Sequence, residues 1–267
     1  MKTPPSRTLF LSGMDVKLYP DPESASIAAA MLIEQVIVDA RAKRGKAVLG
    51  LATGSTPRRV YAHLVARHRA GELSFRDVST YNLDEYYPIA ANDPLSYHTY
   101  MYDNLFKFID LAPERAHLLD GTISEGLAGA HAGLFERSIE ADGGLDAQLL
   151  GIGRNGHIGF NEPSDLTPEA AIKLGTRLVE LHPTTRSDAA AEFGSVERVI
   201  PRALTLGIAT ILSARSIIML ATGPHKAEAV AGALLGPATA QLPASLLSYA
   251  AARTTWLIDH AAARGLE

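Results

Sequence analysis

The chain contains no cysteine, so disulfide bonds and thiolate metal sites are excluded. The absence of cysteine suits a reducing cytoplasm. Basic residues do not cluster: 25 Lys and Arg stand against 29 Asp and Glu, a net charge of −4. Nucleic acid is not expected as a partner, because phosphate backbones need clustered cations. No apolar run approaches the ~20 residues that cross a bilayer, and the apolar patch near the N-terminus is shorter than a secretory signal. We expect a cytoplasmic protein without a membrane partner.

The 267 residues include 47% hydrophobic side chains, enough for a substantial core. Apolar segments typical of buried strands alternate with segments of helical periodicity, which favours a mostly parallel sheet with helices on both faces. We therefore predict a three-layer α/β fold, Rossmann-like and doubly wound, in a single domain spanning 1–267. The expected strands are 16–20, 47–52, 78–83, 147–153, 216–223 and 254–259, and the expected helices are 23–45, 58–71, 97–108, 128–144, 202–214 and 225–236.

Ligands of such folds bind beyond the carboxyl ends of the strands, and four of these ends carry polar residues. The first reads GLATGSTPRRVY, in which Gly54, Ser55 and Thr56 precede a helix beginning at Pro57. Free backbone N–H groups at a helix N-terminus, together with two hydroxyls, form an anion site. A helix cap would explain one hydroxyl, so we favour phosphate binding. The loop is neither a Walker A motif nor G-x-G-x-x-G, so a nucleotide is not specifically indicated. No cofactor is expected.

The second strand end carries two adjacent carboxylates, Asp84 and Glu85. Adjacent side chains of an extended chain point to opposite sides, so these two do not form a glycosidase-type pair facing one cleft. We expect one of them to face the site and the other to support the loop. Apolar and aromatic neighbours reduce solvation, which raises the pKa of a carboxyl group toward that of a useful general base.

The third strand end reads LLGIGRNGHIGFNEPSD and places one histidine among four glycines. Asn155 and Gly156 form a turn signal, and His157 follows them. Glu162 precedes a proline, which restricts it to an extended conformation. Imidazole titrates near neutrality, and Glu162 is close enough along the turning chain to orient and charge-stabilise it. A lone histidine is more often structural, but this setting favours a catalytic His157.

The fourth strand end reads LATGPHKAEAV, with Lys226 in the first turn of the following helix. A cation there opposes the helix dipole, and a bound phosphate would explain its presence. An ordinary exposed lysine is an equally good interpretation of this segment alone. The nine histidines are dispersed and form no H-E-x-x-H pattern, so no metal site is expected.

The chain resembles the glucosamine-6-phosphate deaminases over about residues 16–259. The segments that carry the resemblance, in the same order, are ATGSTP, NLDEYYP, SYHTYMYDNLF, LGIGRNGHIGFNEP, TR at 185–186, ALTLGIATIL, GPHKAEAV and LPASLL. GHIGFNEP is the most specific of them, because the related 6-phosphogluconolactonases share the fold and the Gly-His core but differ at 160–163. The resemblance implies conversion of glucosamine 6-phosphate and water into fructose 6-phosphate and ammonia, as part of amino-sugar catabolism.

The resemblance also implies roles for the reacting end of the site. Asp84 would carry a proton from C2 of the open-chain sugar to C1, and His157, oriented by Glu162, would open the ring. Asn155 stands where many members have aspartate; an amide orients by hydrogen bonding but supplies no charge. Glu85 would belong to the substrate-binding residues, either shaping the loop or assisting the departing amine.

At the other end of the substrate, the resemblance places the phosphate on Gly54, Ser55, Thr56 and Lys226, whose binding energy would position the reacting carbons. Some members also carry an arginine in a lid that reaches the phosphate. The matching position in this chain is Ala191.

Several alternatives remain at this stage. Galactosamine 6-phosphate differs from the glucosamine compound in the direction of one hydroxyl, and the sequence does not show what contacts it. A 6-phosphogluconolactonase would hydrolyse a lactone instead of releasing ammonia. A sugar-phosphate sensor ranks last, because regulators of this fold carry a DNA-binding segment before it and the first expected strand begins near Val16. The expected partner is a small amino-sugar phosphate, and assembly into a homo-oligomer is left open.

Overall fold

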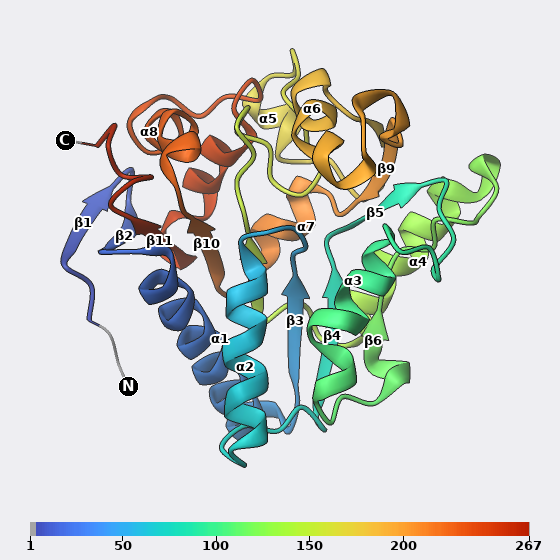
Figure 1. Cartoon of the computed structure of the whole chain (residues 1–267), viewed down its shortest axis with the longest axis horizontal. Coiled ribbons are helices and arrows are strands. Elements are labelled where there is room, and N and C mark those ends of the chain that lie inside the picture. The colour runs from blue at the N-terminus through green and yellow to red at the C-terminus, as the bar shows by residue number, and fades with distance from the viewer. Residues whose placement is uncertain (1–3, 267) are drawn as a thin grey trace.

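The computed structural model describes residues 4–266, which form an eight-stranded, mostly parallel sheet and a smaller antiparallel one (Figure 1). The strand order of the large sheet is β1-β2-β11-β10-β7-β3-β4-β6. β1 is antiparallel to β2, and the other neighbouring pairs are parallel. The strands of this sheet are β1 (Arg7–Leu11), β2 (Met14–Tyr19), β3 (Ala47–Leu51), β4 (Val78–Asn82), β6 (Ala116–His117), β7 (Ala147–Leu150), β10 (Ile217–Ala221) and β11 (Thr254–Asp259).

Helices cover both faces of this sheet, as predicted. α1 and α2 lie side by side over one face, and the 3₁₀ segment η6 contacts β2 and β11 and packs against α7 and α8 (Figure 1). The α-helices are α1 (Pro22–Arg44), α2 (Pro57–Arg69), α3 (Tyr97–Asn104), α4 (Ala128–Ala141), α5 (Pro168–Ala171), α6 (Pro183–Phe193), α7 (Ile208–Ser213) and α8 (Ala227–Leu235). The 3₁₀ segments are η1 (Phe106–Phe108), η2 (Pro113–Arg115), η3 (Glu125–Leu127), η4 (Val196–Arg198), η5 (Pro224–Lys226) and η6 (Pro243–Arg253).

The ends of α1 show how local chemistry fixes these elements. Asp21 accepts the Ser24 backbone N–H at 2.7 Å, and Pro22 occupies the first turn, where it needs no hydrogen bond. Gly45 ends the helix in the left-handed conformation at φ 74°, which disfavours a side chain. The predicted helix over 23–45 is therefore confirmed to within a residue at each end.

A second, three-stranded antiparallel sheet has the order β5-β9-β8 and was not predicted. Its strands are β5 (Asp84–Tyr87), β8 (Arg177–Glu180) and β9 (Arg202–Thr205). The prediction of one helix over 202–214 is wrong in its first part, because this segment contains β9 and then α7. The apolar residues of β9 are buried by pairing with β5 and β8, and the extended Gly207 separates strand from helix.

Other differences concern where elements end. The predicted helix 97–108 is α3 followed by η1, because Leu105 leaves the helical conformation at φ −140°. The predicted strand 147–153 ends at Leu150, and the chain has an additional strand, β1, before the first one predicted. Within residues 4–266, no helix is both long and apolar enough to cross a bilayer.

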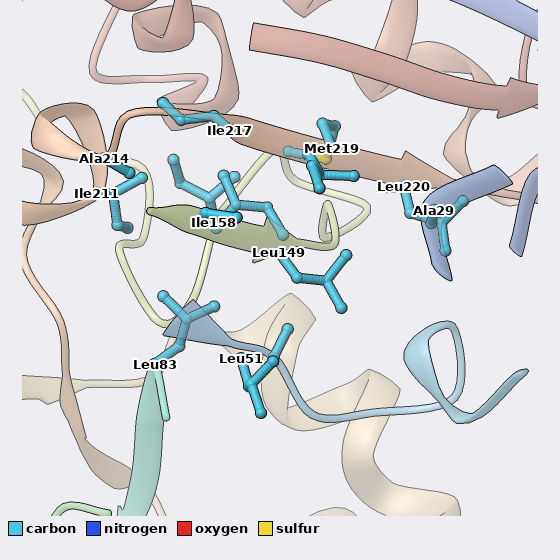
Figure 2. Close-up of a cluster of buried hydrophobic side chains, with 14 of the residues drawn as sticks. Ala29, Leu51, Leu83, Leu149, Ile158, Ile211, Ala214, Ile217, Met219 and Leu220 are labelled. Carbon is cyan, nitrogen blue, oxygen red and sulfur yellow. The ribbon is translucent and has the colours of Figure 1, made fainter. Parts of the chain in front are cut away.

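The core lies between the strands and the helices that cover them. β3, β4, β7 and β10 are buried along their whole length, as expected for parallel strands covered on both faces. Leu51, Leu83, Leu149 and Ile158 from four different segments gather there (Figure 2). The chain leaves β3 toward β4 and β6 on one side and returns to β7, β10 and β11 on the other. The sheet is therefore doubly wound, and its switch point lies between β3 and β7.

Candidate active site

A cavity of about 210 Å³ lies at the carboxyl ends of β3, β4, β7 and β10. Because these strands flank the switch point, the loops that follow them separate and leave a crevice. Six of the predicted residues line it: Gly54, Ser55, Thr56, Asp84, His157 and Lys226. The prediction that separate strand ends converge on one site is thus confirmed geometrically.

Asp84 is the first residue of β5, two positions after the end of β4, so it lies at the junction of the two sheets. It is 5% exposed, and the Thr53 hydroxyl donates to its Oδ1 at a long 3.5 Å. Burial and, to a smaller extent, the negative charge of Glu85 raise the pKa of Asp84 to about 8, although the Thr53 hydrogen bond opposes them. This carboxyl group is therefore held in an environment that favours proton uptake near neutral pH.

Gly159 leaves room for Asp84 beside the backbone of the neighbouring loop. It has a left-handed φ of 57°, and a Cβ there would lie 3.1 Å from Thr205 Oγ1 and 3.6 Å from Asp84 Oδ2. A side chain would therefore strain the backbone and press on the carboxyl group's neighbours.

Glu85 points away from the cavity, as the alternation of side chains in β5 requires. Its carboxylate accepts the backbone N–H groups of Tyr86 and Tyr97 at 2.9 Å and of His98 at 3.1 Å. Burial raises the pKa of Glu85 to about 7, although these N–H donors favour the charged form. The structure therefore corrects the expectation that Glu85 contacts a ligand: it fixes the start of α3, which is the loop-supporting role predicted for one of the pair.

His157 is positioned by a turn after β7. The Gly153 N–H donates to the His157 carbonyl at 2.9 Å, and the imidazole packs directly on Gly153, where a Cβ would lie 2.3 Å from the ring. The Asn155 Oδ1 accepts the His157 backbone N–H at 3.2 Å. Glycine at 153 is therefore a packing requirement of the histidine.

The Nδ1 atom of His157 is turned to Glu162 and Thr185, leaving Nε2 as the nitrogen able to serve the cavity. Glu162 Oε2 lies 3.4 Å from Nδ1, and Thr185 Oγ1 lies 3.1 Å from it. Asn155 Nδ2 donates to the same Glu162 oxygen at 2.9 Å. Burial alone would raise the pKa of Glu162, but His157, Thr185 and Asn155 hold it below its ordinary value. Asn155 and Glu162 therefore orient His157 from behind and do not line the cavity.

The opposite end of the cavity carries the groups suited to an anion. Thr56 precedes α2, but its side chain makes no capping hydrogen bond to that helix. The interpretation of Thr56 as a helix cap is therefore not supported, and its hydroxyl is available to a ligand. The Tyr100 hydroxyl donates to the Gly54 carbonyl at 2.6 Å and holds the loop in place. Lys226 lies before α8, and burial lowers its pKa while Asp188 opposes that effect.

Sequence reasoning did not single out the aromatic wall of the cavity or the residues that α6 contributes to it. The rings of Tyr86, Tyr97 and Phe160 form one wall of the cavity, with Tyr86 and Tyr97 centroids 5.1 Å apart. Thr185, Asp188 and Glu192 reach the cavity from α6, which follows no strand of the large sheet. Two of the omitted residues had a signal in the sequence. Thr53 lies between β3 and Gly54, and Thr185 belongs to the TR segment that carries the resemblance. Among residues 4–266, no three His, Asp or Glu side chains are grouped as a metal site would require.

The sequence model of the family described as glucosamine-6-phosphate isomerases/6-phosphogluconolactonase matches residues 20–256. This chain belongs to that family. The glucosamine-6-phosphate deaminase of Rhodopirellula baltica is 46% identical over 255 residues, covering 95% of this chain and 96% of that protein. Glucosamine-6-phosphate deaminase 1 of Bacillus subtilis is 41% identical over 234 residues, covering 88% of this chain and 93% of that protein.

Solved structures show where the family's fold recurs. A monomeric glucosamine-6-phosphate deaminase superposes with a TM-score of 0.86 at 40% identity, over 94% of this chain and 99% of its own. The 6-phosphogluconolactonase of Trypanosoma brucei, with a TM-score of 0.77 and 21% identity over the whole of both chains, shares the fold.

Within the glucosamine-6-phosphate isomerase/6-phosphogluconolactonase family, the segment 160–163 has a defined place in this site. Phe160 belongs to the aromatic wall, and Glu162 holds His157. Asn161 Nδ2 donates to the carbonyls of Ile158 and Leu206, each at 2.9 Å, and so fixes the loop against β9. The segment 160–163 therefore builds part of the cavity wall and supports the histidine.

Proposed function

We propose that this protein is a glucosamine-6-phosphate deaminase, which converts glucosamine 6-phosphate and water into fructose 6-phosphate and ammonia. One observation carries the proposal beyond family membership: Asp84, a buried carboxyl group with a raised pKa, and His157 line the same cavity as Lys226 and the loop predicted to bind an anion. A sugar phosphate has its reactive carbons and its charged group at opposite ends, and this cavity is divided in the same way.

Ring opening is the first step that the substrate needs, because the closed sugar has no carbonyl group. A proton must pass from the anomeric hydroxyl to the ring oxygen. An imidazole can carry it, because imidazole both accepts and donates a proton near neutral pH. His157 would perform this transfer through Nε2. Glu162, kept ionised by its lowered pKa, stabilises the imidazolium that forms.

Proton transfer between C2 and C1 is the second step. Asp84 would take the C2 proton of the open-chain aldehyde and return it to C1, while O1 gains the proton that the substrate ammonium group loses. This leaves an iminium group at C2, which water hydrolyses to the ketone and ammonia. The cationic amine of the bound substrate lowers the pKa of a neighbouring carboxyl group. Asp84 would therefore be ionised by the substrate on which it acts.

The phosphate would be held by Ser55, Thr56, the backbone around Gly54, and Lys226. These groups lie at a helix N-terminus and on a partly buried cation, both of which favour an anion. Their binding energy would position C1 and C2 between Asp84 and His157.

The decisive assay incubates the protein in parallel with glucosamine 6-phosphate, galactosamine 6-phosphate and 6-phosphogluconolactone, and measures ammonia and ketose phosphate. We expect ammonia and fructose 6-phosphate from the glucosamine compound. The aspartate at 84 is then replaced by asparagine, which should abolish turnover while substrate binding persists; Asp39→Asn, on the exposed surface of α1, is the matched control. A fully active Asp84→Asn variant would remove this residue from the base role.

Faster release of ammonia from galactosamine 6-phosphate would favour the epimer as the natural substrate, and lactone hydrolysis without ammonia would favour the other branch of the family. Binding without any turnover would leave the sensor alternative. A cytoplasmic location and assembly into a homo-oligomer stay predictions, and light scattering of the purified protein measures the second directly.

A further inference from the structure

The charged side chains around the cavity give the proposed phosphate site little positive charge. The lining contains one lysine, Lys226, but three carboxyl groups: Asp84, Asp188 and Glu192. A phosphate ester carries close to two negative charges at neutral pH. The exposed carboxylate of Asp188 lies on the same side as Lys226, and it raises the pKa of that lysine. An anion entering this end would meet a negative charge as well as a positive one.

A second cation lies just outside the lining and is attached to that carboxylate. Arg154 Nε donates to Asp188 Oδ1 at 2.7 Å and to Oδ2 at 3.0 Å, and Arg154 Nη2 lies 2.5 Å from Oδ1. Arg154 belongs to the loop that follows β7, whereas Asp188 belongs to α6. The pKa of Lys226 is lowered chiefly by burial and further by Arg154, so the three charges lie within range of one another.

We propose that Arg154 is a phosphate-binding residue that Asp188 holds at the rim of the cavity until an anionic substrate replaces the carboxylate. The inference deepens the proposed function, since it assigns a further contact to the sugar-phosphate substrate. Arg154 would also stand in for the lid arginine that the resemblance places at position 191, where this chain has alanine.

The exchange is favourable on physical grounds. The Arg154 and Asp188 side chains are 46% and 36% exposed, and ion pairs of this exposure contribute little to stability. A phosphate carries more charge than a carboxylate and accepts two parallel N–H bonds from one guanidinium. Asp188 is exposed enough to be hydrated once Arg154 leaves it.

A different role for the same contact gives the opposite experimental signature. If the ion pair only ties α6 to the loop of His157, removing either partner loosens the same contact, and both variants weaken anion binding. If Asp188 competes with the anion for Arg154, removing the aspartate frees the arginine and strengthens anion binding. The sign of the Asp188→Asn effect therefore separates the two roles.

The experiment measures the Kd of inorganic phosphate by titration calorimetry, at constant low ionic strength, for the full chain and three variants. We expect Arg154→Gln to raise the Kd about tenfold, as loss of a charge-assisted contact at a partly exposed site would, and Asp188→Asn to lower it. Arg154→Lys should lie between, because the ammonium keeps the charge but not the two-pronged geometry. Arg67→Gln is the matched control: Arg67 makes the same kind of exposed two-bond pair with Glu34, on α2 and away from the cavity.

An unchanged Kd in Arg154→Gln, or a raised Kd in both Arg154→Gln and Asp188→Asn, would overturn the proposal. The same variants assayed with glucosamine 6-phosphate should show a KM that follows the phosphate Kd. Because phosphate binding is measured without turnover, the two proposals fail separately. Absence of ammonia release with an Arg154-dependent Kd contradicts the deaminase alone, and ammonia release with an Arg154-independent Kd contradicts this inference alone.

Discussion

Asp84→Asn should make the free protein more stable, by an amount that grows with pH. The side chain is 5% exposed, and its pKa rises from an ordinary 3.8 to about 8, chiefly because burial disfavours the charged form. A carboxyl group whose pKa is raised by folding contributes stability below its unfolded pKa, and this contribution is lost as the pH rises through the folded pKa. The wild-type protein should therefore lose stability from about pH 4 to about pH 8 on account of this group.

The magnitude follows from the two pKa values. Their separation, at about 1.4 kcal/mol for each pH unit, gives about 6 kcal/mol once the pH exceeds both. Between about pH 5 and about pH 9 the free energy of unfolding should fall by about 4 kcal/mol, because at pH 5 the protein has already lost the remaining part of this stability. Asparagine does not titrate, so the stability difference between variant and wild type should grow by about this amount over that range.

Urea unfolding at a series of pH values measures the difference, with the fluorescence of Trp256, the single tryptophan and fully buried, as the probe. Any constant effect of burying an amide cancels, because only the slope with pH is used. Asp39→Asn, on the exposed surface of α1, controls for the loss of one negative charge. A difference that stays flat between about pH 5 and about pH 9 would refute the raised pKa of Asp84 and with it the argument that the cavity prepares a base.

Three further predictions concern the neighbours of Asp84. His157→Gln should lose more activity on the closed-ring substrate than on an open-chain analogue, and equal losses would contradict the ring-opening role. Glu162→Gln should destabilise the protein near neutral pH, and the effect should fade as the pH falls through the lowered pKa of Glu162; urea unfolding at neutral and acidic pH measures this slope. Gly159→Ala should cost about 1–2 kcal/mol, from its φ of 57° and the 3.1 Å approach to Thr205, and a parallel loss of turnover would show that the loop positions Asp84.

The large sheet could be predicted from the sequence because its signals are local. β3 and β10 are apolar along their whole length and β7 is mostly so, and a glycine or polar residue follows each of these strands within two positions. Four candidate loops then follow from the general position of ligands in parallel sheets. The convergence of Asp84, His157 and Lys226 on one cavity was accessible in this way.

The second sheet was not accessible, because its signals depend on distant pairing. β9 is four residues long, and the apolar sequence continues from it into α7 without a change of polarity. The spacing of apolar residues therefore predicts one helix where the chain has a strand followed by a helix. Its strand conformation is decided by β5 and β8, which come from residues more than twenty positions away. For the same reason, no pattern in α6 indicated that Thr185 contacts His157.

The two sheets together explain how one site holds carboxyl groups in opposite protonation states. Asp84 lies at the junction of the sheets, where it is buried. Its one side-chain hydrogen bond, from the Thr53 hydroxyl, is long and lowers its pKa only weakly, so the effect of burial dominates and the pKa rises. Glu162 is also largely buried, but its carboxylate accepts hydrogen bonds from the Asn155 side chain and the His182 backbone N–H, and it faces the imidazole of His157. These polar neighbours favour the charged form, so the pKa of Glu162 falls. Groups whose environments push their pKa values apart can take different parts in one reaction. Asp84 is therefore prepared to exchange a proton, and Glu162 is prepared to keep its charge while His157 exchanges one.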